Sequence, residues 1–234
     1  MTFPHVAVAT ITWARTPDEA TLLLRSLERL SGLGLPIAVA DAGKDAAFTA
    51  RLRRLPNLRV VVPESPGLVA QVERSLTAAA ECDRPFVLYV EPDKLQFFQH
   101  GLHTFLLYAP VDAGVGIVIA SRSPNSFDTF PPMQRYTEAV MNHLCAETFG
   151  AHGDYSYGPF LIRRTLLSQL LPLPAHLGWG WRHFAFMRAH RHGLRLVHIV
   201  GDHPCPTGQQ VEDHAERGHR IRQLSQNLLG LIEP

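Results

Sequence analysis

The sequence Glu91-Pro92-Asp93 places two carboxylates at the end of an apolar run, FVLYV (86–90), and is the sharpest chemical feature of this 234-residue chain. The run is typical of a buried strand. Burying two acids side by side is unfavourable unless a cation lies beside them. A divalent metal held by Asp93, with phosphate oxygens completing its shell, would meet that need. A solvated turn with Lys94 as the local partner is the alternative, and it is the commoner pattern.

A histidine late in the sequence offers a second metal ligand. His203 follows the run LRLVHIV (194–200) within Gly201-Asp202-His203-Pro204. Imidazole and carboxylate together suit Mn²⁺ or a similar ion, so His203 could complete a metal site with Asp93. The alternative is a turn histidine that is hydrogen-bonded to Asp202.

Asp41 is the polar residue at the end of a predicted strand over 36–41, just before Ala42-Gly43. Its carboxylate could accept hydrogen bonds from a ribose or a base edge, and it could equally cap a helix or a turn. The sequence after the first predicted strand, ATITWARTP (9–17), contains neither GxGxxG nor GxxxxGK[ST]. This absence argues against a dinucleotide Rossmann site and a P-loop.

The first 120 residues must position these side chains, and they alternate short β-branched runs with amphipathic stretches. This pattern predicts βαβ units with right-handed crossovers and a mostly parallel sheet that is covered by helices on both faces. Ligands of such sheets bind beyond the carboxyl ends of the strands. We expect strands at 6–12, 36–41, 57–63, 84–93 and 115–121, and helices from Pro17 to about Gly32 and over 45–55, 67–81 and 95–108.

The second half has a different pattern. It begins with a polar, Pro-rich loop at 122–132 that looks too punctuated for regular structure. Beyond it we expect helices at about 133–149, 181–192 and 209–231, a short strand within 154–164 and a strand at 194–200. No repeat and no linker divides the chain. We therefore predict one α/β domain over 1–234, with a nucleotide-binding half (1–121) and an acceptor-binding half (122–234).

Composition narrows the class of protein. Lys and Arg total 22 against 21 Asp and Glu, for a net charge of +1, which argues against a nucleic-acid partner. The most apolar runs are strand-sized and too short to span a bilayer. Cys82, Cys145 and Cys205 are odd in number and lack metal-ligand spacing, which is typical of isolated thiols in a reducing compartment. The sequence predicts a soluble cytoplasmic protein.

With its features in this order, the sequence from about residue 5 to 208 resembles the nucleotide-sugar glycosyltransferases of the GT-A fold, a mostly parallel Rossmann-like sheet flanked by helices. Glu91-Pro92-Asp93 is similar to the Asp-x-Asp metal motif of that family, with Glu in the first position. Ser121-Arg122 is similar to a strand end of the type GSR. Asp41 falls where the family's strand-two aspartate contacts the nucleoside.

The second half carries the remainder of the resemblance. Residues 154–164 (DYSYGPFLIRR) are similar to the acceptor-side loop and strand of the family. Residues 176–199 resemble the helix GWGYEDxDxxxRxxxxG and the strand that follows it. The chain resembles family-2-like and mannosylglycerate-synthase-like members. His203 matches the late metal-ligand histidine of some members, notably the retaining enzymes that glycosylate glycerate and phosphoglycerate.

The resemblance implies a metal-dependent glycosyltransferase that moves a sugar from a nucleotide-diphosphate donor to a small or glycan acceptor, and it allows a retaining reaction. A metal ion, Mn²⁺ or Mg²⁺, bound by Asp93 and His203 would neutralise the leaving diphosphate. The residues implied to hold the donor are Thr10, Thr12, Asp41, Gln71 and Glu91. Those implied to hold the acceptor are Arg135, Asp154, Tyr155, Tyr157 and Trp179, and those implied in the reaction are Asp93, His183 and Arg122.

One pair of residues departs from the family pattern. Inverting members carry their catalytic base in an acid pair where this sequence has Arg182 and His183. His183 could be a base near neutral pH or a packing residue. If it is no base, the enzyme is retaining or its activity is lost. The alternatives are therefore a catalytically silent GT-A-like module that binds a nucleotide sugar or a partner, and a sugar nucleotidyltransferase, which would carry a Gly-rich, lysine-bearing loop after the first strand.

Overall fold

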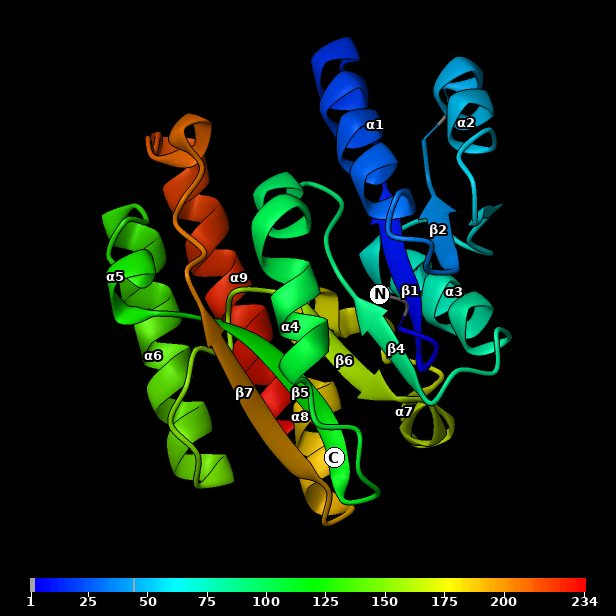
Figure 1. Cartoon of the computed structure of the whole chain (residues 1–234). Coiled ribbons are helices and arrows are strands. Elements are labelled where there is room, and N and C mark those ends of the chain that lie inside the picture. The colour runs from blue at the N-terminus through cyan, green and yellow to red at the C-terminus, as the bar shows by residue number, and fades with distance from the viewer. Residues whose placement is uncertain (1–2, 44) are drawn as a thin grey trace. The chain divides into compact units, whose positions relative to one another are not determined.

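The computed structural model describes residues 3–43 and 45–234 and divides them into two compact units (Figure 1). The first unit comprises the described residues up to Leu106 together with Pro159–Leu173. The second comprises Leu107–Gly158 and Pro174–Pro234. The expected single domain with two halves that meet at residue 121 stays a prediction.

The first unit is built on five strands that lie in the order β3-β2-β1-β4-β6. The strands β3, β2, β1 and β4 run parallel to one another, and β6 pairs antiparallel with β4. Their bounds are β1 (Val6–Thr12), β2 (Ile37–Asp41), β3 (Leu58–Val61), β4 (Phe86–Tyr89) and β6 (Phe160–Arg163). Every residue of β1, β2 and β4 is buried, which explains why these strands read as continuous apolar runs.

The helices of the first unit follow from the strand order. Right-handed crossovers place α1 and α2 on one face of the strands and α3 on the other, because the chain reverses its direction across the sheet between β3 and β4. The first helix starts as predicted, since Thr16 Oγ1 accepts from Glu19 N at 3.2 Å with Pro17 at the first position. The bounds are α1 (Pro17–Ser31), α2 (Ala46–Leu52), α3 (Leu68–Ala80), a π-helical turn (Phe97–Gly101) and α7 (Leu167–Leu170). A further helix, α4 (Leu102–Tyr108), begins in the first unit and has its last two residues in the second.

The reversal gives the first unit a topological switch point between β1 and β4, the place where open α/β sheets bind ligands. Ala9 of β1 lies opposite Tyr89 of β4, where β4 ends, whereas β1 continues to Thr12. Glu91 and Asp93 therefore leave the sheet at the level of the last residues of β1.

The second unit contains two parallel strands, β5 and β7, and the helices α5, α6, α8 and α9 (Figure 1). The long helix α9 packs against α6, α8 and the 3₁₀ segment before α8. Gly180 and Gly230 permit this packing, because a Cβ on either would lie 2.0 Å from a backbone oxygen of the other segment. The bounds are β5 (Val115–Arg122), α5 (Pro124–Phe127), α6 (Pro132–Phe149), the 3₁₀ segment Ala175–Gly180, α8 (Trp181–Arg191), β7 (Arg195–Gly201) and α9 (His214–Ile232).

One element contradicts its prediction from the sequence. The segment 122–132, expected to lack regular structure, contains the short helix α5. Ser123 Oγ accepts from Ser126 N at 3.3 Å and Pro124 occupies the first helical position, so the same polar and proline residues that suggested a loop start a helix. In the described part of the chain, no helix combines the length and the apolarity that crossing a bilayer would require.

Candidate functional site

The carboxylate of Asp41, at the end of β2, is engaged by neighbours in the first unit. Oδ1 accepts from Thr12 Oγ1 and from Gly43 N, each at 3.1 Å, and Oδ2 accepts from Thr49 Oγ1 at 2.6 Å. Asp41 thus closes the turn after its strand and ties it to β1 and α2. Of the two roles that the sequence left open, the turn contact is observed and the nucleoside contact stays a prediction.

Gln71 and Thr10 are two further polar residues near the carboxyl ends of β1 and β2. The amide of Gln71, on α3, donates to Thr12 O at 2.9 Å and to Ala40 O at 3.2 Å, so it fixes the ends of β1 and β2. The hydroxyl of Thr10 is buried and has no hydrogen-bond partner among the described residues. A buried hydroxyl without a partner is unfavourable, and a ligand oxygen could satisfy it.

Asp93 offers the clearest fit to a metal ion. The turn that carries it is closed by Leu95 N, which donates to Asp93 O at 2.9 Å. Its Oδ1 is buried without a hydrogen-bond partner among residues 3–43 and 45–234. Within those ranges no three His, Cys, Asp or Glu side chains cluster as a metal site. The unpartnered Asp93 Oδ1 could serve as a protein ligand of Mg²⁺ or Mn²⁺, ions that complete their shells with phosphate oxygens and water.

Trp13, directly after β1, is a candidate that the sequence argument missed. Its side chain is 61% exposed, and the guanidinium carbon of Arg15 lies 5.8 Å from the ring centroid. An exposed aromatic ring at the ligand-binding edge can stack on a planar base. The signal that could have found it is its position, the first residue beyond a fully buried strand at a switch point.

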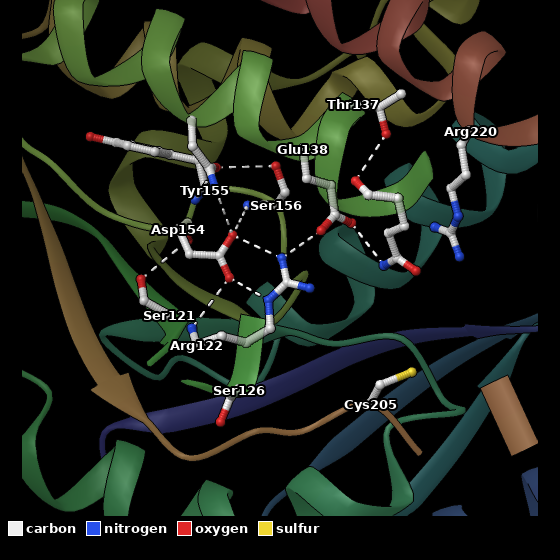
Figure 2. Close-up of polar contacts among 12 residues, drawn as sticks. Ser121, Arg122, Ser126, Thr137, Glu138, Asp154, Tyr155, Ser156, Cys205 and Arg220 are labelled. Atoms are coloured by element: carbon white, nitrogen blue, oxygen red, sulfur yellow. Dashed lines mark hydrogen bonds and ion pairs between the residues drawn. The ribbon is translucent and has the colours of Figure 1, made fainter. Parts of the chain in front are cut away.

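Three charged side chains form a buried network in the second unit (Figure 2). Arg122 Nε lies 2.5 Å from Asp154 Oδ2, and Arg122 Nη2 lies 2.6 Å from Glu138 Oε2. Burial by itself would lower the pKa of Arg122, but the charges of Glu138 and Asp154 raise it above its ordinary value. Burial would raise the pKa of Asp154, and Arg122 outweighs this and lowers it. This bonding favours a structural role for Arg122, and its role in the reaction stays a prediction.

Further hydrogen bonds extend the network to the predicted acceptor loop. Asp154 accepts from Ser156 N at 3.1 Å and from Asn142 Nδ2 at 3.3 Å, and Tyr155 N donates to Asn142 Oδ1 at 2.8 Å. The Tyr155 hydroxyl donates to Ala151 O at 2.6 Å, and burial raises its pKa. The side chains of Asp154 and Tyr155 are therefore committed to holding the loop, and their contact with an acceptor stays untested.

His203 is buried and oriented by Tyr157, with the two rings stacked at 5.0 Å and 4°. Its backbone N–H donates to Ser126 Oγ at 3.0 Å. Burial lowers the pKa of His203, which favours the neutral imidazole that binds metals. His203 belongs to the second unit and Asp93 to the first, and their sharing one ion stays a prediction from the sequence.

The residues at the start of α8 differ in their access to solvent. His183 is 0% exposed, and burial, followed by the charge of Arg182, lowers its pKa to about 3. A neutral, enclosed imidazole favours the packing alternative over a base. Trp179 is half-buried, with the guanidinium carbon of Arg182 5.5 Å from its ring centroid.

Arg135, on α6, forms an ion pair near the start of its helix: its Nη1 lies 3.6 Å from Asp128 Oδ1.

A pocket with about 220 Å³ of empty space, its open mouth included, lies among α6, α8 and α9 in the second unit. It is lined by Thr137, Glu138, Ser156, Arg182, Arg220, Gln223, Leu224 and Asn227. None of the five predicted acceptor-binding residues lines it. The recurrence of Arg220, Gln223 and Asn227 at helical spacing on one face of α9 is the sequence signal that was missed.

Comparison with solved structures identifies the fold. A complex of glucosyl-3-phosphoglycerate synthase from Mycobacterium tuberculosis with Mn²⁺, UDP and glucosyl-3-phosphoglycerate is similar at a TM-score of 0.67 and 20% identity, over 97% of this chain and 80% of that chain. The complex of that enzyme with Mg²⁺ and UDP gives 0.66 and 18%, over 97% and 79%. Its complex with Mn²⁺, UDP-glucose and phosphoglyceric acid gives 0.65 and 17%, over 97% and 79%.

The chain therefore has the GT-A fold, with mostly parallel strands flanked by helices, as its sequence predicted. The similar structures bind Mn²⁺ or Mg²⁺ together with UDP or UDP-glucose. No protein-family description and no curated protein matches the sequence of this chain.

Proposed function

We propose that the chain is a metal-dependent glycosyltransferase that takes a sugar from a nucleoside-diphosphate donor. The observation that carries this proposal is the buried, unsatisfied Oδ1 of Asp93 at the switch point of a GT-A fold. An acidic oxygen at that position needs a cation, and a nucleotide diphosphate needs the same cation.

The first unit supplies the donor side of the proposed site. Asp93 would hold the divalent ion, which stabilises the negative charge of the leaving diphosphate when it is bound. Thr10 would donate its free hydroxyl to a donor oxygen, and Trp13 would stack on the nucleobase. Asp41 and Gln71 would keep the ends of β1 and β2 in place. Asp41 Oδ2, which accepts one hydrogen bond from Thr49, would accept a second from the nucleoside. Glu91 would lie against the ribose.

The reaction that fits these residues is a retaining transfer. At the positions of the inverting acid pair, Arg182 is a cation and His183 is enclosed and neutral, so the chain offers no protein base there. In the proposed step the bond from the sugar C1 to the phosphate oxygen breaks and the bond from C1 to the acceptor oxygen forms on the same face. The acceptor proton passes to the leaving phosphate.

Loss of activity is the second candidate, and the same pair favours it. A silent module would bind the nucleotide sugar at β1 and β4 and transfer nothing.

The exposed Cys82 and the buried Cys145 and Cys205 are all free thiols, which suits a reducing compartment. We therefore place the protein, whether active or silent, in the cytoplasm.

Turnover of donor sugars tests the proposal. The protein is incubated with UDP-glucose or GDP-mannose and Mn²⁺, with and without three-carbon acceptors, and release of nucleoside diphosphate and the product anomer are followed by NMR. We expect metal-dependent release, a product that retains the donor anomer, and loss of both in Asp93→Asn. Nucleotide binding with no release for any donor would support the silent module, and an inverted product would contradict the retaining step.

A further inference from the structure

The imidazole of His203 is enclosed by neighbours of the second unit on a face and on an edge. Tyr157 covers a face, since the two buried rings are stacked with their centroids 5.0 Å apart and 4° between their planes. Gly201 lies against an edge: a Cβ on this glycine would stand 2.6 Å from His203 Nε2 and 2.8 Å from Cε1. The φ of Gly201 is not positive, so the ring and not the backbone conformation requires glycine there.

The main chain that carries His203 is fastened to the segment 123–129, which contains α5. Three hydrogen bonds join the alternate residues 201, 203 and 205 to this segment: Ser123 N donates to Gly201 O at 2.9 Å, His203 N to Ser126 Oγ at 3.0 Å and Cys205 N to Thr129 Oγ1 at 2.8 Å. Figure 2 shows Ser126 beside the chain that leads from β7 to Cys205. The backbone of the turn is therefore fixed on both sides of His203.

The groups that hold His203 are themselves held. The guanidinium carbon of Arg122, in the buried ionic network, lies 5.6 Å from the centroid of the Tyr157 ring. Asp202 Oδ1 accepts from Ser123 Oγ at 2.8 Å, and the backbone of Asp202 forms a hydrogen bond with the His203 ring. A hydrogen bond from the backbone to a histidine ring fixes its tautomer and its orientation, as it does around histidines that bind metals.

This degree of fixation suits a metal ligand better than a packing residue. For packing alone an imidazole is a poor choice, because burial of its polar nitrogens is unfavourable. A ring that already has one orientation loses little conformational entropy when it binds an ion. His203 combines both properties: it is a polar ring in a buried position, and its neighbours leave it one orientation.

We propose that Tyr157, Gly201 and Ser126 are positioning residues that hold the His203 imidazole in the orientation in which it binds the divalent ion. Tyr157 sets the plane of the ring, Gly201 gives its edge room, and Ser126 fixes the main chain below it. The assignment depends on the proposed metal-dependent function and uses residues of the second unit alone. Residues that orient a metal ligand in this way typically contribute about 10- to 100-fold in metal affinity.

Binding of Mn²⁺ to the UDP-bound protein tests the proposal. The Kd of Mn²⁺ is measured by calorimetric titration of the whole chain, with Mn²⁺ titrated into UDP alone as the blank. Pulsed electron paramagnetic resonance of the bound Mn²⁺ detects a coordinating nitrogen. His203→Ala should weaken Mn²⁺ binding and remove the nitrogen signal, and its loss of affinity is the largest that a positioning variant can reach.

Gly201→Ala is the most specific variant, because the added methyl group displaces the ring while the backbone tolerates alanine. We expect Mn²⁺ binding to weaken about tenfold or more and the nitrogen signal to decrease. Gly208→Ala is the matched control in the same unit, since a Cβ there meets no heavy atom of the described residues within 4 Å. Its Kd should stay within about twofold of wild type.

Two pairs of variants test the other positioning residues, and they answer the question if Gly201→Ala fails to fold. Tyr157→Leu removes the stacked ring and should weaken Mn²⁺ binding about tenfold, whereas Tyr157→Phe keeps the ring and should recover most of the affinity. Ser126→Ala removes the acceptor of the His203 N–H, and Ser126→Thr, which keeps the hydroxyl, should restore binding.

A double-mutant cycle distinguishes positioning from general damage to the fold. In a His203→Ala background there is no ring to displace, so adding Gly201→Ala should change the Kd by less than about twofold. The proposal is overturned by an equal loss of Mn²⁺ affinity from Gly201→Ala with and without the imidazole. It is also overturned by wild-type affinity in both Gly201→Ala and Tyr157→Leu.

Comparison of His203→Ala with Asp93→Asn separates this assignment from the proposed function. Loss of Mn²⁺ affinity in Asp93→Asn, with a wild-type Kd and nitrogen signal in His203→Ala, contradicts the positioning role and leaves the metal-dependent transferase standing. Wild-type Mn²⁺ affinity in both variants contradicts the proposed function as well.

Discussion

The carboxylates of the two units have opposite surroundings. In the first unit, Asp93 ends in an oxygen that no described residue satisfies, at the edge where parallel sheets bind ligands. In the second unit, Asp154 and Glu138 are bonded to Arg122 at 2.5 and 2.6 Å, and further amides complete their shells. All three side chains are carboxylates, although Asp93 is half-buried with a buried Oδ1 while Asp154 and Glu138 are buried throughout. The difference that matters for chemistry is whether their oxygens have partners in the fold.

That difference separates a binding group from a scaffold. A carboxylate with all of its partners in the fold has little to offer a ligand, and its removal damages the fold. A carboxylate that lacks a partner is unfavourable to the apo fold and becomes favourable when a cation arrives. Substitutions in the two groups should therefore move stability and ligand affinity in different proportions.

Removing the central cation of the second unit should give the largest effect. Arg122→Met leaves Asp154 and Glu138 as uncompensated buried charges, so we expect a loss of about 3–5 kcal/mol in the free energy of unfolding, measured by urea denaturation. Arg135→Met is the matched control, since that arginine is part-exposed and 3.6 Å from Asp128, and should lose less than about 1 kcal/mol. A loss below about 1 kcal/mol for Arg122→Met would remove the distinction between scaffold and site.

Acid should destabilise the second unit through His183. The pKa of this buried imidazole is lowered to about 3, below its unfolded value of about 6.5, so the unfolded chain binds the extra proton between these pH values. The unfolding free energy therefore falls as pH decreases through that window, by about 2 kcal/mol at pH 5 from this group alone. His183→Gln should flatten the dependence, and substitution of the exposed His143 should not. An unchanged pH profile in His183→Gln would show that the ring is not held neutral.

Trp13 should affect ligand affinity without affecting the fold. Its ring is exposed, so Trp13→Ala should leave the melting temperature of the apo protein nearly unchanged. Loss of stacking worth about 0.5–1.5 kcal/mol should weaken UDP binding by roughly 2- to 13-fold in calorimetry. Substitution of Tyr136, an exposed aromatic on α6, serves as the control. Equal affinity for UDP in wild type and Trp13→Ala would exclude the ring from the base site.

Much of the scaffold was predictable because it is local in sequence. The buried strand β1 is a continuous apolar run, and α1 carries its cap, its proline and its apolar face within one segment. The short helix α5 was missed because Ser123-Pro124 can begin a helix or a loop, and neighbouring residues did not decide between them.

The site was less predictable because hydrogen-bond satisfaction depends on residues far apart in the chain. Asp154 was expected at the acceptor, and its partner Arg122 lies 32 positions away. The pocket takes lining residues from α6, α8 and α9, so no single motif marks it. By contrast, the strand ends that carry Asp41 and Asp93 could be aligned from the sequence, because parallel strands bring their carboxyl ends to one edge.

The most direct test of the central claim is the metal-dependent part of nucleotide binding. The melting temperature is measured with UDP or UDP-glucose, with and without Mn²⁺, for wild type, Asp93→Asn and the exposed control Asp18→Asn. We predict that Mn²⁺ raises the melting temperature further in the nucleotide-bound wild type and Asp18→Asn, and that it adds nothing in Asp93→Asn. A ligand at a hundredfold excess over its Kd stabilises the fold by up to about 2.7 kcal/mol of unfolding free energy. A metal-dependent shift of the same size in Asp93→Asn, or no nucleotide shift in any of the three proteins, would contradict the account.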